Sequence, residues 1–473
     1  MSFLLIGKFP ETTLVQAFRS WATDAMSVNT PNPRQNPTRA RWITAFWLCG
    51  LAGVLYLDRI CMAQAIVPIQ REFNLDNRAI SYVMMAFTLA YGICEVPAGR
   101  MGDLMGPRLV LVRIVAWWSA FTMLTGACTG FYSLLLVRFL FGAGEAGALP
   151  NAGRVIASWF PVSERGRMQG LMLASAQVGG VLAPVATAWL IDKTGWRLAF
   201  SVFAFAGFAW AAGFWWWFRD NPGSHSAVNK EELDAIRGDS PPASTPHAPV
   251  PWGAVLANRG MLSLGFIAIF AAFYTYYFYS WFPKYLISAH GLGNQAAGNF
   301  ASMVIGGSAV GMLAGGWLAD RISRRAADPI LSQKRVAAAC YAISALCLVI
   351  GARMPDPLSL SAWWCASFMV MHVTLPNWWV VATRQAGVHV GAILGLLNGV
   401  GIVGALASQW FVGAFTDWRS GLDLSPRQQW DPMFDLYGLV LLLNAVAWWS
   451  FRLSPLAETS EPNRPESAPS PPG

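Results

Sequence analysis

Twelve stretches of about 20 mainly apolar residues follow one another along the chain, and this repetition restricts the fold more than any other feature. A helix of that length crosses the hydrocarbon core of a bilayer. Only 12% of the 473 residues are charged, whereas soluble proteins carry about 25%. The stretches begin near Ile43, Ile80, Leu109, Phe131, Met168, Trp196, Met261, Ala297, Arg335, Leu358, Val388 and Phe434. The sequence therefore predicts an all-α membrane protein with twelve transmembrane helices.

Polar segments divide the chain into five parts. Residues 1–41 form an N-terminal tail, 42–218 a first six-helix bundle, and 219–257 a charged, proline-rich linker. A second six-helix bundle follows over 258–455, and the proline-rich residues 456–473 are expected to be disordered. An even number of spans places both ends of the chain on the same side of the membrane.

The distribution of basic residues indicates which side this is. Lys and Arg are concentrated in the tails, the linker and the short loops on the side of the termini, and they are scarce in the opposite loops. Basic loops stay in the cytoplasm, so we expect a multi-pass protein of the cell (inner) membrane with both termini and the linker cytoplasmic. The net charge of +8 is spread over helix ends rather than gathered in one patch, which argues against a nucleic-acid partner.

The cysteines and polar motifs give no sign of an enzyme. All seven cysteines lie in apolar stretches without zinc-ligand spacing. The sequence contains no catalytic triad, no phosphate-binding glycine loop and no His/Cys/Asp cluster. We therefore expect neither a metal nor another cofactor.

Four charged residues interrupt the apolar stretches: Asp58, Arg59, Arg138 and Glu145. A charge at mid-bilayer depth is costly unless it faces water or a partner, so these residues indicate a path for something charged. The planar guanidinium of Arg59 matches the two oxygens of a carboxylate, which favours anion recognition. The alternative for Arg59 is a structural salt bridge to an acidic residue.

Glu145 lies in the segment GAGEAGA, where small residues let neighbouring helices approach closely. A carboxylate shielded from water can take up and release a proton near neutral pH, as a proton-coupled carrier requires. The alternative is a permanently protonated glutamate that bonds across helices. Arg138 lies two turns earlier on the same helix face, from which we expect it to influence Glu145 or to meet Asp58.

A loop motif occurs at matching places in the two bundles. GRMGDLMGPR (99–108) follows the second stretch and GWLADRISRR (316–325) follows the eighth, and such internal repeats are typical of transporters that rock between two conformations. The motif, the twelve spans and the long central loop resemble the major facilitator superfamily over about 42–455. Within this range YLDR, RFLFGAGEAGALPNAGRVIASWFP, SERGRMQG and ASAQ resemble its anion:cation symporter family. That family includes bacterial carriers of galactonate, glucarate and hexuronates and the sialin-type carriers of animals.

The resemblance implies two pseudo-symmetric six-helix halves and proton-coupled symport of a small organic anion, such as a sugar acid. It implies that Arg59 binds the substrate carboxylate and that Asp58 takes part in proton coupling. From the residues themselves we expect Glu145 to carry the proton and Arg138 to help couple it to the substrate. Positions matching the family's binding residues in the first half are Tyr56, Tyr91 and Gln177, with Tyr82 as an alternative to Tyr91. In the second half we expect the pocket to be completed by Tyr276, Tyr277, Tyr279, Asn377 and Asn398. We expect the protein to work as a monomer in the lipid bilayer.

The two loop motifs predict a cytoplasmic gate in which opposite charges pair across the halves. Its expected members are Asp103, Arg108, Arg154, Asp320, Arg321 and Arg325. Leu104 stands where the superfamily usually has a basic residue, which predicts a weaker gate. Glu95 is either a second titratable site or a carboxyl near the cytoplasmic end, and His372 is either a pH sensor or a hydrogen-bonded core residue.

A second hypothesis is an exchanger or uniporter for phosphorylated or aromatic organic anions. Phosphate exchangers of this fold carry one arginine in each half, but the seventh stretch has no Lys or Arg before Lys284. A ligand with a single carboxylate therefore fits better. The fifth stretch lacks the antiporter pattern G-x-x-x-G-P-x-x-G-G, which argues against drug–proton antiport, and coupling to sodium in place of the proton stays open.

Overall fold

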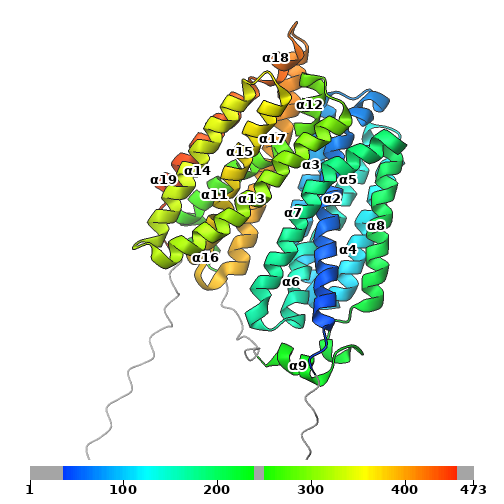
Figure 1. Cartoon of the computed structure of the whole chain (residues 1–473), viewed down its shortest axis with the longest axis vertical. Helices are drawn as coiled ribbons and strands as arrows, with labels where there is room; N and C mark the ends of the chain where they lie inside the picture. The colour runs from blue at the N-terminus through cyan, green and yellow to red at the C-terminus, as the bar shows by residue number, and fades with distance from the viewer. Residues whose placement is uncertain (1–35, 239–249, 455–473) are drawn as a thin grey trace, which may run out of the picture.

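The structure is a computed structural model that describes residues 36–238 and 250–454, and these residues fold into two groups of helices lying side by side (Figure 1). Among the described residues, twelve helical spans are long and apolar enough to cross a membrane, which confirms the predicted fold class. The proposed disordered tail 456–473, residues 1–35 of the N-terminal tail and residues 239–249 of the linker lie outside the described residues.

The first half contains six spans, of which the fourth is broken into two helices. The spans are α2 (Ala40–Phe73), α3 (Asn77–Met105), α4 (Pro107–Gly126), α5 with α6 (Phe131–Glu145 and Ala148–Trp159), α7 (Val162–Thr194) and α8 (Trp196–Trp217). The predicted start at Met168 lies inside α7 because the polar segment VSERGR forms the first turns of that helix.

The second half repeats this arrangement with short extensions. Its spans are α11 (Arg259–Ser280) continued by α12 (Phe282–His290), α13 (Asn294–Arg325), α14 (Pro329–Ala352), α15 with α16 (Pro357–His372 and Thr374–Ala386), α17 (Val390–Ser420), and α18 with α19 (Pro426–Trp430 and Met433–Ser450). Shorter elements are η1 (Pro222–Ser224), α9 (Lys230–Arg237), α10 (Trp252–Ala257) and η2 (Gly387–His389). We refer to the two groups as the N-half and the C-half.

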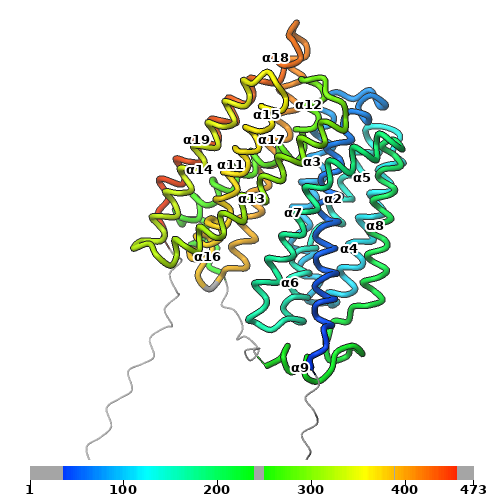
Figure 2. Tube along the Cα trace, in the orientation of Figure 1, coloured from blue at the N-terminus to red at the C-terminus, as the bar shows by residue number. Residues whose placement is uncertain are grey.

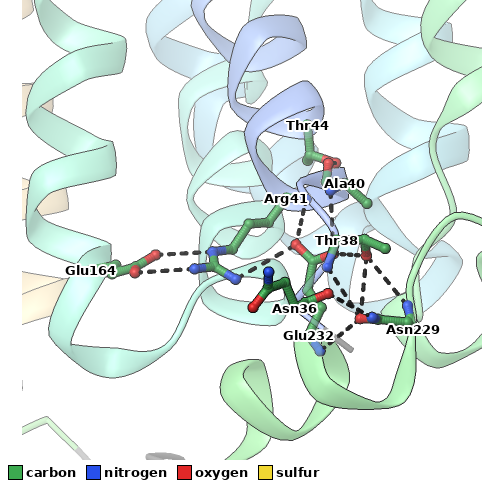
Figure 3. A network of polar contacts seen from close by, with 8 residues as sticks. All are labelled: Asn36, Thr38, Ala40, Arg41, Thr44, Glu164, Asn229 and Glu232. Atoms are coloured by element: carbon green, nitrogen blue, oxygen red, sulfur yellow. Dashed lines mark hydrogen bonds and ion pairs between the residues drawn. The ribbon is translucent and has the colours of Figure 1, made fainter. Parts of the chain in front are cut away.

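The linker helix α9 is attached to the start of α2 (Figure 3). The carboxylate of Glu232, which is fully buried, accepts hydrogen bonds from the backbone amides of Ala40 at 3.2 Å and Arg41 at 3.1 Å. Arg41 also forms an ion pair with Glu164 at the start of α7. A carboxylate at a helix N-terminus satisfies free backbone donors and interacts favourably with the helix dipole. The first part of the linker is therefore held by the N-half.

The halves touch at the end that carries α12 and α18 and diverge towards the end that carries α9 (Figure 1, Figure 2). We call these the distal end and the linker end. At the distal end Asp417 accepts hydrogen bonds from the amides of Asn77 at 3.0 Å and Arg78 at 2.6 Å, at the start of α3. Other side-chain hydrogen bonds between the halves include Gln64–Asn294, Asn294–Asp192, Gln70–Lys284, Asn77–Thr416, Thr88–Gln409 and Gln177–Ser308. Within the described ranges no hydrogen bond or ion pair joins the halves at the linker end.

Candidate functional site

Arg59 and Glu145 form an ion pair between α2 and α5 in the middle of the N-half. The Nε of Arg59 donates to Oε1 of Glu145 at 2.9 Å, and a terminal nitrogen of the guanidinium donates to the same oxygen. The guanidinium carbon lies 4.6 Å from the ring centroid of Tyr91, 5.6 Å from Phe87 and 5.7 Å from Tyr56. Aromatic faces attract a cation, so these three rings help to hold the Arg59 guanidinium beside Oε1 of Glu145.

The second oxygen of the Glu145 carboxylate, Oε2, is buried and has no hydrogen-bond partner among the described residues. Glu145 itself is 1% exposed, whereas the side chain of Arg59 is 17% exposed. The ion pair that the sequence left open as an alternative for Arg59 is therefore present in this conformation. The carboxylate retains a free oxygen on which a proton can reside.

Glycines determine where Glu145 lies. A Cβ on Gly142 would meet the backbone oxygen of Phe87 at 2.4 Å, and one on Gly144 would meet the ring of Trp117 at 1.7 Å. Gly147 has a φ of +83°, a left-handed conformation that glycine adopts without strain. The segment GAGEAGA thus lets α5 contact its neighbours closely and ends the helix at Glu145.

Asp58 and Arg138 complete the charged group but form no ion pair among the described residues. Asp58 is 1% exposed, and neither carboxylate oxygen has a hydrogen-bond partner there. Arg138 is also 1% exposed, and its guanidinium lies 4.3 Å from the ring centroid of Phe141 and 5.2 Å from that of Phe87. The structure therefore brings four ionisable groups into one buried region, with Arg59 and Glu145 alone in direct contact.

A cavity of about 430 Å³ lies between the halves, and most of its wall belongs to the C-half. Its volume falls within the range of about 300–1,000 Å³ that is common for small-molecule sites. Five of the predicted binding residues line this cavity: Tyr56, Gln177, Tyr276, Tyr279 and Asn398. The guanidinium carbon of Arg59 lies 5.7 Å from the ring centroid of Tyr56, so Arg59 is adjacent to a residue of the cavity wall.

Besides Arg59, three other predicted residues do not line the cavity. Tyr91 packs against Arg59 and donates a hydrogen bond to Glu95 at 3.3 Å. Asn377 is fully buried in α16, and its amide has no partner among the described residues. Tyr277 is 1% exposed and lies among the rings of the C-half core, 5.3 Å from Phe434 between centroids. One position along α11 turns the side chain by about 100°, which separates Tyr277 from its neighbour Tyr276.

A family model described as the Major Facilitator Superfamily matches residues 48–330. The chain belongs to the major facilitator superfamily. Two curated relatives are named as probable transporters of organic acids. A probable sulfoacetate transporter of Cupriavidus necator is 28% identical over 420 residues, covering 88% of this chain and 94% of the relative. A probable L-galactonate transporter of Escherichia coli is 33% identical over 327 residues, covering 67% and 71%.

The fold of a solved superfamily transporter is also similar. A bacterial homologue of the human lysosomal transporter Spinster, solved in an inward-facing and unoccupied conformation, gives a TM-score of 0.71 at 18% identity. The match covers 87% of this chain and 96% of the other. The major facilitator fold and the resemblance to sugar-acid carriers are thereby confirmed, and this superfamily member is a membrane transporter and not an enzyme.

The gate residues of the superfamily loop motif pair within each half rather than across the halves in this conformation. Arg154 forms a bidentate ion pair with Asp103, at 2.5 and 2.7 Å, inside the N-half. Arg108 lies over the ring of Trp215, and the backbone of Arg108 contacts Asp220. In the C-half the Asp320 carboxylate contacts Arg324 of the same helix, Arg321 lies over Trp317, and Arg325 is exposed. Pairing across the halves therefore remains a prediction for another conformation.

Several cavity residues were not expected from the sequence. These are Thr275, Tyr341, His372, Thr374, Trp378 and Trp379. The break between α15 and α16 explains part of this set, because it re-aims the side chains that follow it. The residue after the end of α15 is Val373, which is neither glycine nor proline, so the sequence does not mark the break at that position. Pro376, three residues later, was the one local signal of an interrupted helix.

Proposed function

We propose that this transporter imports a small organic anion, such as a sugar acid or a related carboxylate, together with a proton. The relatives named for sulfoacetate and L-galactonate support an organic anion as substrate. The single observation that carries the coupling hypothesis is the ion pair between Arg59 and Glu145 beside the cavity.

The ion pair links the two cargoes by competition. While Glu145 is ionised, it occupies the guanidinium that a substrate carboxylate would need. A proton on Glu145 removes this competitor and leaves Arg59 free to form a bidentate contact with the substrate. A proton and an anion then bind together, which is what symport requires.

Asp58 and Arg138 are proposed to tune this exchange. The Asp58 carboxylate has no hydrogen-bond partner among the described residues, and a buried charge without a partner is costly. A shift of Arg138 away from the rings of Phe87 and Phe141 would provide that partner. Asp58 is thus a candidate for a second proton-binding group.

The conformation fits release or loading at the linker end. The basic loops favour a cytoplasmic location for this end, and the cavity lies between halves that touch at the distal end. We infer that the protein acts as a monomer in the inner membrane and rocks its halves to open the distal end. In that second conformation Asp103, Asp320 and the gate arginines would meet.

The test is uptake of radiolabelled anions into proteoliposomes with and without an inward proton gradient. A sodium gradient at constant pH is the control for the identity of the coupling ion. We expect Glu145→Gln to bind substrate but to lose accumulation driven by the proton gradient. We expect Arg59→Ala to lose binding by at least about 100-fold, the scale of a bidentate charged contact.

Two results would reject the proposal. Glu145→Gln that still concentrates substrate in response to the proton gradient would remove Glu145 from the coupling. Uptake that needs an anion on the opposite side, but no cation gradient, would identify an exchanger instead.

A further inference from the structure

The part of the C-half that lines the cavity carries no charged side chain among the described residues. Its wall consists of aromatic and aliphatic groups with a few neutral polar ones, including Thr275, His372 and Asn398. In the N-half, the guanidinium carbon of Arg59 lies 5.7 Å from the ring centroid of Tyr56, which lines the cavity. A bound anion would therefore place one charged group near Arg59 and the rest of its body against a neutral wall.

His372 has a fixed hydrogen-bonding role in this wall. Its Nδ1 lies 2.8 Å from the backbone oxygen of Phe368, one turn earlier in α15. A carbonyl oxygen only accepts, so Nδ1 carries the hydrogen and Nε2 of the neutral ring is an acceptor. Nε2 forms no hydrogen bond within the described residues, and it is not among the atoms sealed inside the protein.

The packing holds the ring of His372 in place. The side chain is 5% exposed, and its ring lies 4.2 Å from that of Phe368 in an edge-to-face arrangement. A Cβ on Gly311 of α13 would meet the backbone oxygen of Met369 at 2.1 Å and the Cβ of His372 at 3.2 Å. The backbones of α13 and α15 are thus in close contact beside His372. No carboxylate of the described residues forms an ion pair with His372.

We propose that His372 determines specificity by accepting, at Nε2, a hydrogen bond from a hydroxyl group on the uncharged part of the substrate. This inference rests on the proposed function, because it assumes that an organic anion occupies the cavity. The preferred substrate class is then a monoanion with a hydroxyl group distant from its carboxylate. A dianion is disfavoured, because its second carboxylate offers only acceptors to Nε2 and finds no cation on that wall.

Substrates that differ only at the distant end test this proposal without any change to the protein. The probes are D-galactonate, its 6-deoxy analogue and galactarate, which end in CH₂OH, CH₃ and a second carboxylate. A second set, of shorter chains, is 4-hydroxybutyrate, butyrate and succinate. A third set, of aromatic acids, is 4-hydroxybenzoate, benzoate and terephthalate. Binding is measured by titration calorimetry on the purified full-length protein at one pH. Within each set that binds, we expect the hydroxylated monoanion to bind at least about fivefold more tightly than the other two members, the scale of one hydrogen bond.

Two substitutions assign the preference to His372. His372→Phe keeps a ring but removes the acceptor, and should reduce the preference for the hydroxylated member to about twofold or less. His372→Gln retains an acceptor oxygen and should preserve part of the preference. His290→Phe is the matched control, because His290 contacts Tyr285 near the distal end and is not part of the cavity wall.

The outcomes separate this inference from the proposed function. Equal binding of hydroxylated, deoxy and dianionic members by the native protein would overturn it, as would an unchanged preference in His372→Phe. Loss of the proton-gradient effect with the preference intact would reject proton coupling and leave the role of His372 standing. Absence of binding in every set would count against both proposals.

Discussion

The two halves of this transporter face the same cavity with different chemistry. The N-half holds two carboxylates and two guanidinium groups inside its helices: Asp58, Arg138 and Glu145 are buried, and Arg59 is partly exposed. The cavity wall of the described C-half is neutral and rich in aromatic rings. Because charges are costly inside a membrane, our proposal assigns the ionic events to the N-half. It assigns recognition of the uncharged part of the substrate to the C-half.

The largest expected effect comes from removing the ion pair that distinguishes the N-half. Arg59→Gln leaves Glu145 buried without its partner, which typically costs about 3–5 kcal/mol. The double variant Arg59→Gln with Glu145→Gln removes both charges, and we expect it to recover most of this stability. Thermal unfolding of the purified proteins measures the difference.

Transport separates the structural role of the pair from its functional role. Both variants should lose anion uptake by more than about 100-fold, because neither retains the Arg59 guanidinium that is proposed to bind the substrate carboxylate. Uptake close to the native level in the double variant would show that the pair only stabilises the fold.

A smaller effect is expected from the glycines that fix the key residue of each half. Gly144→Ala would collide with Trp117 next to Glu145, and Gly311→Ala would collide with the backbone beside His372. Overpacking of this kind typically costs about 1–3 kcal/mol. We expect Gly144→Ala to impair proton-driven accumulation and Gly311→Ala to alter the preference among substrates. Gly153→Ala is the control, since no atom lies within 4 Å of the position that its Cβ would occupy.

The sequence was sufficient to predict the twelve helices and the charged group of the N-half. Apolar stretches of membrane-spanning length are local patterns, and isolated charges within them are visible without a structure. The sequence could not predict that Arg59 pairs with Glu145, because the two residues lie on different helices and only packing brings them together.

The C-half of the site was harder to predict for a different reason. Neutral polar and aromatic residues occur both in cores and in binding sites, so Tyr276 and Tyr277 could not be distinguished by type. The structure separates them by one step around α11, with Tyr276 at the cavity and Tyr277 in the core. The break in the tenth span likewise re-aims Trp378 and Trp379.

The attachment of the linker to the N-half gives a moderate prediction. Glu232→Gln removes the charge that meets the N-terminus of α2 and the guanidinium of Arg41. We expect a loss of about 1–2 kcal/mol in stability, since hydrogen bonds to charged groups contribute about 1.5–3 kcal/mol and the amide keeps part of them. Glu231→Gln, its neighbour in the first turn of α9, should change the unfolding temperature less. Equal shifts for the two variants would show that the buried carboxylate adds nothing specific.

The smallest effect on stability is expected where the halves meet, at Asp417. The Asp417 carboxylate belongs to the C-half and accepts hydrogen bonds from the first two amides of α3 in the N-half. Asp76, in the N-half itself, accepts a hydrogen bond from the amide of Ala79. Asp417→Asn keeps a hydrogen-bond acceptor but loses the favourable interaction with the helix dipole, which is worth about 0.3–1 kcal/mol. Because this contact exists only while the distal end is closed, its loss should favour the conformation open at that end.

Distances between spin labels at Arg71 and Ser420, which are both exposed at the distal end, measure this shift in a variant whose native cysteines are replaced. A change of about 0.3–1 kcal/mol alters the ratio of the two conformations by roughly two- to fivefold. Asp423→Asn is the control, because Asp423 is exposed and forms no hydrogen bond or ion pair within the described part of the chain. An unchanged distance distribution in Asp417→Asn would mean that the apolar contacts between the halves, rather than this cap, keep the distal end closed.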